Sequence, residues 1–252
     1  MHDFASLNKE SAMTEYEKFY RENLYPFQDG ILSIVRHIDV PFYLTGGTAL
    51  SRHYSPVRYS DDLDLFVNRD PEFSKWAERF YAALEIESRR GSFAILTDRV
   101  LRFEDYVQLF LQQQSLGNEA VTLKMDLVND VAPHYGDIER DSTLGRVDSW
   151  RNILSNKVSA LYRIEAKDVV DLWTLARIRS FNWADIIREA SSKEAGLDPI
   201  ILHDLLKSFP REGLSSIKWI NPKPDEDLIM ADLSVMADEM FEGKRNTLAA
   251  DP

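Results

Sequence analysis

The chain has 252 residues, of which 44% are hydrophobic, no cysteine, and a formal net charge of -12. This size and composition are enough for a hydrophobic core, in one large domain or two smaller ones, and exclude a disordered chain. The lack of cysteine excludes disulfides, thiolate metal sites and a cysteine nucleophile, and fits the reducing cytoplasm, where we expect the protein. The acidic charge argues against a protein that coats nucleic acid. We find no signal peptide and no apolar run of about 20 residues, so we expect no membrane partner.

Hydrophobic periodicity predicts a mixed first half. Its elements, in chain order, are a helix over 14–24 that stops near Pro26, a second helix up to Pro41, a strand over 42–44, a short helix over 48–54, a strand over 63–67, a helix from Pro71, and strands over 93–97, 107–111 and 121–128. A turn is predicted at 116–118. Residues 1–150 are therefore expected to form one α/β domain.

The strand signal fades after about residue 150. Apolar stripes at helical spacing cover 153–161, 169–176, 198–206 and 229–240. Asp198 precedes Pro199 and is a natural N-cap for the third of these helices. Residues 243–252 are expected to fray. We therefore predict an α+β fold in which a helical domain, residues 151–252, follows the mixed sheet.

A glycine pair between the first strand and the next helix is a candidate phosphate site. Gly46 and Gly47 directly follow the apolar run 42–44. Such a turn gathers backbone N–H groups at the start of a helix, where the partial positive charge favours phosphate. Thr48 can cap that helix or donate a hydrogen bond to phosphate. For the glycines alone, a plain tight turn is the ordinary alternative.

Two aspartates on one face of the next predicted strand support the interpretation of the glycine turn as a phosphate site. Alternation places Asp62 and Asp64 on the same face, where like charges repel unless a cation or an arginine joins them. One or two carboxylates, together with substrate phosphates, are the usual ligands of Mg²⁺. Asp126, in a later strand, is the candidate for a third metal ligand or for a base that accepts the proton of an attacking hydroxyl, with Asp130 as the fallback.

These residues resemble a known family. Segments 46–50 and 58–66 are similar to the core motif of the DNA polymerase β-like nucleotidyltransferase superfamily, and more narrowly to that of the AbiEii/AbiGii toxin family. A second signature of that family is a helical lysine, then an arginine, then an Arg-Asp-x-x-Asp-Leu element, which this chain matches with Lys157, Arg163 and residues 167–172. The resemblance implies a polymerase β-like mixed sheet flanked by helices, with a helical domain that contributes a lysine and an aspartate to the active-site cleft.

The resemblance also implies a role for each matching residue. Those assigned to nucleotide binding are Gly46, Gly47, Thr48, Arg58, Lys157 and Arg163. Those assigned to metal binding or catalysis are Asp62, Asp64 and Asp168, and Asp168 is thereby an alternative to Asp126, the candidate from the strand pattern, as the base. The chain departs from the family pattern at Lys167, which replaces an arginine, and in a wider spacing between the glycine pair and Asp62.

Ordinary structural roles remain open for several of these side chains. Lys157 can be an exposed helix lysine, and Asp168 can cap a helix that starts at Val169. Arg163 can pair with a nearby carboxylate for little gain in stability. Asp171 is best interpreted as structural, fixing Lys157 or Lys167.

The resulting hypothesis is a Mg²⁺-dependent nucleotidyltransferase that moves a nucleoside monophosphate from an NTP to an acceptor hydroxyl. The resemblance implies a toxin of a toxin–antitoxin or phage-defence system, with RNA or tRNA as acceptor and a cognate antitoxin as partner. Two alternatives remain: transfer to a small molecule or a protein, which the acidic charge favours, and a non-catalytic nucleotide-binding module on the same fold.

Overall fold

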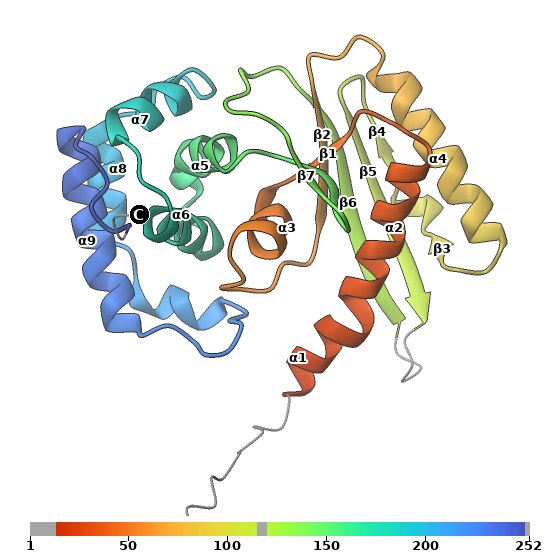
Figure 1. Ribbon diagram of the computed structural model, residues 1–252, viewed down its shortest axis with the longest axis horizontal. Coiled ribbons are helices and arrows are strands. Elements are labelled where there is room, and N and C mark those ends of the chain that lie inside the picture. The colour runs from red at the N-terminus through yellow and green to blue at the C-terminus, as the bar shows by residue number, and fades with distance from the viewer. Residues whose placement is uncertain (1–13, 115–119, 250–252) are drawn as a thin grey trace, which may run out of the picture.

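The computed structural model describes residues 14–114 and 120–249, and it contains one mixed sheet with helices on both faces (Figure 1). The strands are β1 Tyr43–Thr45, β2 Leu63–Asn68, β3 Ala94–Ile95, β4 Leu101–Arg102, β5 Tyr106–Gln114, β6 Ala120–Asp130, β7 Glu139–Asp141 and β8 Gly145–Val147. The helices are α1 Glu15–Phe19, α2 Tyr25–His37, α3 Gly46–Ala49, α4 Phe73–Arg89, α5 Trp150–Ser159, α6 Ala166–Ile178, α7 Trp183–Ser191, α8 Pro199–Lys207 and α9 Glu226–Glu242.

The strand β2 lies at the centre of the sheet. The strand order is β3-β5-β6-β2-β1-β8-β7, and β4 also pairs with β5. β2 runs antiparallel to β1 and parallel to β6. Alternate residues of β2, namely Leu63, Leu65 and Val67, are buried in the hydrophobic core. Figure 1 shows α2 and α4 on one side of the sheet, and α3 with the helices α5 to α9 on the other. The opposite face of β2 is therefore turned toward α3 and the later helices.

The N-terminal helices differ from the prediction at Pro26. The chain does not stop there: α1 continues through a π-helical turn, Tyr20–Leu24, directly into α2, with Pro26 in its first turn. A proline lacks the N–H that an α-helix interior requires, and the π turn before it changes the hydrogen-bond register at that point. The predicted break is therefore a local change of helix type.

The sheet agrees with the prediction in its long strands and departs from it in its short ones. The strands expected over 63–67, 107–111 and 121–128 are present as β2, β5 and β6. The strand expected over 93–97 shrinks to Ala94–Ile95, and β4, β7 and β8 were not predicted. Strands of two or three residues are too short to show a period, so only their pairing partners reveal them. The turn predicted at 116–118 lies outside the described residues.

From Trp150 onward the described chain is mainly helical. The predicted cap at Asp198 is confirmed, because its carboxylate accepts a hydrogen bond from the backbone N–H of Ile200. The prediction missed α7, although Trp183, Ile186 and Ala190 recur at helical spacing and are buried. None of the helices in the described parts of the chain combines the length and apolar character that crossing a membrane requires.

The segment after α9 is ordered against the helices, and the prediction of a frayed tail is wrong up to residue 249. Asn246 is 2% exposed, and its side-chain amide donates hydrogen bonds to the carbonyls of Ala176 and Arg179 at 2.6 and 2.7 Å. The side-chain hydroxyl of Thr247 donates to Glu239. The two bonds of Asn246 close the C-terminal end of α6, whose last carbonyls would otherwise lack partners, and Thr247 ties the tail to α9.

We expect Asn246→Ala to lower the free energy of unfolding by about 1–3 kcal/mol, because it leaves buried carbonyls without donors. Urea unfolding followed by circular dichroism measures the change. Ser215→Ala is the control, since that exposed hydroxyl bonds only the nearby carbonyl of Glu212 and its loss should change stability by less than about 0.5 kcal/mol. An Asn246→Ala variant as stable as the control would contradict the role given to the tail.

Candidate active site

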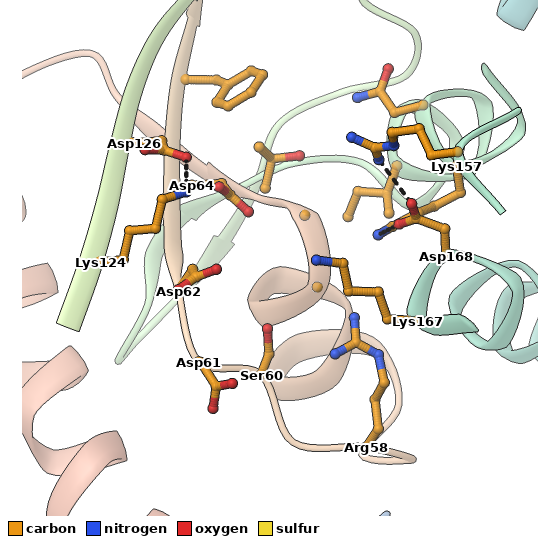
Figure 2. Close-up of a pocket in the computed structure, with 17 residues that line it drawn as sticks. Arg58, Ser60, Asp61, Asp62, Asp64, Lys124, Asp126, Lys157, Lys167 and Asp168 are labelled. Atoms are coloured by element: carbon orange, nitrogen blue, oxygen red, sulfur yellow. Dashed lines mark hydrogen bonds and ion pairs between the residues drawn. The ribbon is translucent and has the colours of Figure 1, made fainter. Parts of the chain in front are cut away.

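A cleft of about 370 Å³ opens between the central strands and the helices α5 and α6. Nine of the ten predicted site residues line it: Gly46, Gly47, Arg58, Asp62, Asp64, Asp126, Lys157, Arg163 and Asp168. Figure 2 shows the carboxylates of β2 and β6 on one side and the cations Arg58, Lys157 and Lys167 on the other. Residues more than 100 positions apart in the sequence thus meet at one opening.

Thr48 is the predicted residue that does not line the cleft. Its side chain is fully buried, and its hydroxyl donates a hydrogen bond to the backbone carbonyl of Asp62 at 2.5 Å. This bond ties the first turn of α3 to the residue directly before β2. In the structure Thr48 therefore positions the glycine turn relative to the carboxylates, and its hydroxyl is already occupied.

The glycines bring the backbone close to polar side chains. Gly46 has φ +69°, a conformation that residues with a side chain rarely adopt, and a Cβ built there would overlap the Asp64 carboxylate. A Cβ on Gly47 would meet the guanidinium of Arg58 and the hydroxyl of Ser60. Thr45 precedes the turn, and its hydroxyl donates to Asp148 instead of capping α3. The start of α3 therefore has no side-chain cap and stays available to an acceptor.

Asp62 and Asp64 have no hydrogen-bond donor or ion-pair partner on their carboxylates among the described residues. Burial, together with the neighbouring charges of Asp126 and Asp62, raises the pKa of Asp64 to about 6. Burial likewise raises the pKa of Asp62, although the charge of Lys124 opposes this shift. Unpaired, repelling carboxylates cost stability in the protein alone. The arrangement therefore fits a bound cation, as hard oxygen ligands for Mg²⁺ require.

Asp126 is placed as predicted, but its oxygens are already engaged. It lies in register with Asp64 on the neighbouring strand, and so on the same face of the sheet. One oxygen accepts hydrogen bonds from Tyr106 and Gln108 at 2.9 and 3.0 Å, and the other contacts Lys124 Nζ at 2.5 Å. Within the described residues no group of three or more His, Asp or Glu side chains is arranged as a metal cage. The structure thus separates Asp126 from the unpaired pair on β2.

The fallback residue, Asp130, lies at the far end of β6. Its backbone carbonyl accepts a hydrogen bond from the side chain of Asn68, and its carboxylate accepts one from the backbone N–H of Ala132. It does not line the cleft. Of the two carboxylates considered on β6, only Asp126 therefore faces Asp64.

A chain of ion pairs forms the opposite wall of the cleft. Arg58 makes a two-pronged contact with Asp171 at 2.6 and 2.7 Å, Lys157 bridges Asp171 and Asp168 at 2.7 Å each, and Arg163 contacts the second oxygen of Asp168 at 2.8 Å. Burial disfavours the charge on Asp171, but Lys157 and Arg58 outweigh it and lower its pKa below the ordinary value. Three cations share two carboxylates, so this wall keeps an excess positive charge.

This wall decides between the roles left open for its members. Lys157 is buried, so it is not an ordinary exposed lysine, and Asp171 fixes Lys157 rather than Lys167. Asp168 does not cap a helix, because α6 already begins at Ala166. Both of its oxygens are engaged by cations, Lys157 on one and Arg163 on the other. The structure therefore presents Asp168 as the group that holds Lys157 and Arg163 at the cleft.

Several residues of the site were not predicted. Lys124 lies between the buried Leu123 and Met125 on β6. This alternation already indicates that its side chain points to the opposite face, which lines the cleft. Asp61 also lines the cleft and is held by Tyr20 and Lys218. Lys218 lies in a segment that pairs with the stretch before β2: the N–H of Tyr59 donates to the carbonyl of Lys218 at 2.8 Å. No sequence period signals this long-range pairing.

We expect Asp64→Asn to raise the stability of the protein in EDTA at pH 8. Its pKa of about 6 lies above the unfolded value, so ionisation of Asp64 costs free energy as the pH rises from about 4 through 6. The gain is on the order of 1–3 kcal/mol at pH 8 and should vanish near pH 4. Urea unfolding of both proteins at the two pH values measures it. If the two proteins differ in free energy of unfolding by the same amount at pH 4 and at pH 8, the raised pKa of Asp64 is not the cause.

We expect Gly46→Ala to lower the free energy of unfolding by about 1–3 kcal/mol, because the new Cβ meets the Asp64 carboxylate at a positive φ. Gly30→Ala is the matched control. Gly30 lies in α2 with open space around it, so alanine there should stabilise the protein by about 0.5–1 kcal/mol. Thermal unfolding of the two variants measures the change in melting temperature. Changes of the same sign in both variants would contradict the close contact between a Cβ at position 46 and the Asp64 carboxylate.

Comparison with known proteins places this site in context. A family model described as nucleotidyl transferase AbiEii toxin, type IV toxin–antitoxin system, matches residues 35–246. The solved structure of JHP933 from Helicobacter pylori is similar with a TM-score of 0.59 at 20% identity, over 87% of this chain and 91% of that chain. MenT4, a nucleotidyltransferase toxin from Mycobacterium tuberculosis, is similar with a TM-score of 0.51 at 16% identity, over 86% and 83%. No curated protein sequence matches the chain. The structural likenesses confirm the predicted fold class.

Proposed function

Because the chain belongs to the AbiEii family of nucleotidyltransferase toxins, we propose that it transfers a nucleoside monophosphate from an NTP to a hydroxyl of RNA, with tRNA as the first candidate, and that Mg²⁺ supports the reaction. The observation that carries this proposal is the pair of unpaired carboxylates, Asp62 and Asp64, beside the glycine turn and across the cleft from an excess of positive charge. A purely structural site gains nothing from that repulsion.

The side chains divide the work between metal and nucleotide. Asp62 and Asp64 would hold Mg²⁺, and the bound ion would supply positive charge that stabilises the triphosphate during phosphoryl transfer. Lys157 has three N–H donors and two carboxylate partners, so one donor remains for a phosphate oxygen. Arg163 is 61% exposed and binds Asp168 through one nitrogen, and its remaining donors are in reach of the nucleotide. The N–H groups of Gly46 and Gly47 supply further donors.

The buried ion pairs keep these cations in place before substrate arrives. Asp171 fixes Arg58 and Lys157, and Asp168 fixes Lys157 and Arg163. A preorganised positive wall stabilises the charge of the transferring phosphoryl group without having to reorganise during the reaction. The proposed reaction takes place in the cytoplasm, and a cognate antitoxin restrains it, as the type IV toxin–antitoxin description of the family suggests.

The first test is incubation of the protein with total tRNA, Mg²⁺ and each NTP labelled at the α-phosphate. We expect label to enter RNA with at least one NTP, and Asp62→Asn and Asp64→Asn to lower the rate by at least about 100-fold, because each removes a metal ligand. A γ-phosphate label should not enter the product, since pyrophosphate leaves.

Glu85→Gln is the control for the loss of one negative charge. Glu85 is exposed on α4, which lies on the other side of the sheet, and the variant should transfer at the wild-type rate. Transfer by Asp64→Asn at the rate of this control would contradict the proposal. NTP binding that needs neither Mg²⁺ nor Asp64 in calorimetry, together with no transfer, would favour the non-catalytic module.

A protein or small-molecule acceptor is the second candidate, and the net charge of -12 favours it, because tRNA binding generally uses a wide positive surface. Digestion of the labelled product separates the candidates. Ribonuclease releases the label from an RNA product, and protease releases it from a protein product. A label that resists both and has a low mass identifies a small molecule.

A further inference from the structure

We propose that Lys124 takes the place of a second metal ion, so that the active site uses one divalent cation together with a built-in ammonium group. This inference rests on the proposed metal site at Asp62 and Asp64. It assigns Lys124 a positioning role in the reaction and removes Asp126 from the set of metal ligands.

The position of Lys124 in β6 directs its side chain toward the cleft. Its neighbours Leu123 and Met125 are fully buried on the core face, so alternation turns Lys124 and Asp126 to the opposite face. There Lys124 Nζ lies 2.5 Å from Asp126 Oδ2, and both residues line the same cleft as Asp64 (Figure 2). Asp126 is in register with Asp64, so the ammonium occupies the carboxylate that a second ion between the two strands would need, and its charge also acts on Asp62 and Asp64.

Asp126 has little capacity left for a metal ion while Lys124 is in place, because three of the about four lone-pair positions of its carboxylate are already used. Its other oxygen accepts hydrogen bonds from the hydroxyl of Tyr106 and the amide of Gln108, and that amide also donates to Tyr106 at 2.7 Å. A divalent ion on Asp126 has to displace the ammonium and then lie beside it, where two positive charges repel. The hydrogen-bonded side chains of β5 therefore hold Asp126 as the partner of Lys124.

The charges of the site agree with a single divalent ion. Three carboxylates, Asp62, Asp64 and Asp126, and the ammonium of Lys124 leave two negative charges on this wall. One Mg²⁺ neutralises them. In the absence of nucleotide, a second divalent ion would leave the wall positive, opposite the Arg58–Lys157–Arg163 wall that already carries excess positive charge.

The test counts metal ions on the full-length protein without nucleotide. Mn²⁺ replaces Mg²⁺, and electron paramagnetic resonance measures free Mn²⁺ during a titration. We expect one ion on the wild type and on Asp126→Asn, and none on Asp64→Asn. Lys124→Met keeps the length of the side chain but loses its charge, and should bind two ions, because Asp126 becomes a free ligand. The double variant Lys124→Met, Asp126→Asn should again bind one ion, as the wild type does.

Lys167→Met is the matched control. Lys167 also lines the cleft, but its ammonium pairs with Glu165 at 3.0 Å, away from Asp126, so this variant should bind one ion. Lys124→Arg, which keeps the positive charge, should also bind one. Lys124→Gln, which loses the charge but keeps a polar side chain, should bind two ions and replaces Lys124→Met if that variant does not fold. Two ions on the wild type, two on Asp126→Asn, or one on a folded Lys124→Met would overturn the inference. A wild type that binds no ion would overturn the proposed metal site as well.

Discussion

Asp62 and Asp64 lie two residues apart on one face at the central strand β2, and their carboxylates have no hydrogen-bond donor or ion-pair partner among the described residues. Burial and the charges of neighbouring carboxylates raise the pKa of both, a cost in stability that the fold has to bear. The surrounding structure holds the two carboxylates in place in spite of that cost. The hydrophobic face of β2 fixes the carboxylates to a rigid strand, and Thr48 ties the glycine turn to their backbone. Functional sites commonly carry such locally unfavourable arrangements.

Across the cleft from these carboxylates lies the positively charged wall of Arg58, Lys157 and Arg163. Its cations are already paired, since Asp168 and Asp171 are buried and each contacts two of them. Such a network is expensive to bury and costly to break in part, so its geometry tolerates little variation. The cleft is therefore a gap between an unpaired anionic strand and a preorganised cationic helix pair, an arrangement that suits a metal-bound polyphosphate.

The C-terminal segments do more than cover the core. Residues next to Lys218 pair with the stretch that leads into β2, and Lys218 itself contacts Asp61 at the edge of the cleft. Asn246 closes the end of α6, the helix that carries Asp168 and Asp171. Both contacts connect the last fifth of the chain to elements of the site. They give a physical reason why the family match extends as far as residue 246.

The sequence by itself determined the central strands and the amphipathic helices, because alternation and helical spacing are local properties of the chain. Nine of the ten site residues predicted from it line the cleft. The sequence placed Asp62 and Asp64 on one face and indicated Lys157, Arg163 and Asp168 through a family pattern. Only the tertiary structure decided which charges are paired. That Asp126 is engaged by Lys124, that Asp168 holds two cations, and that Thr48 is buried all depend on contacts between strands and helices distant in the chain, which no local period encodes.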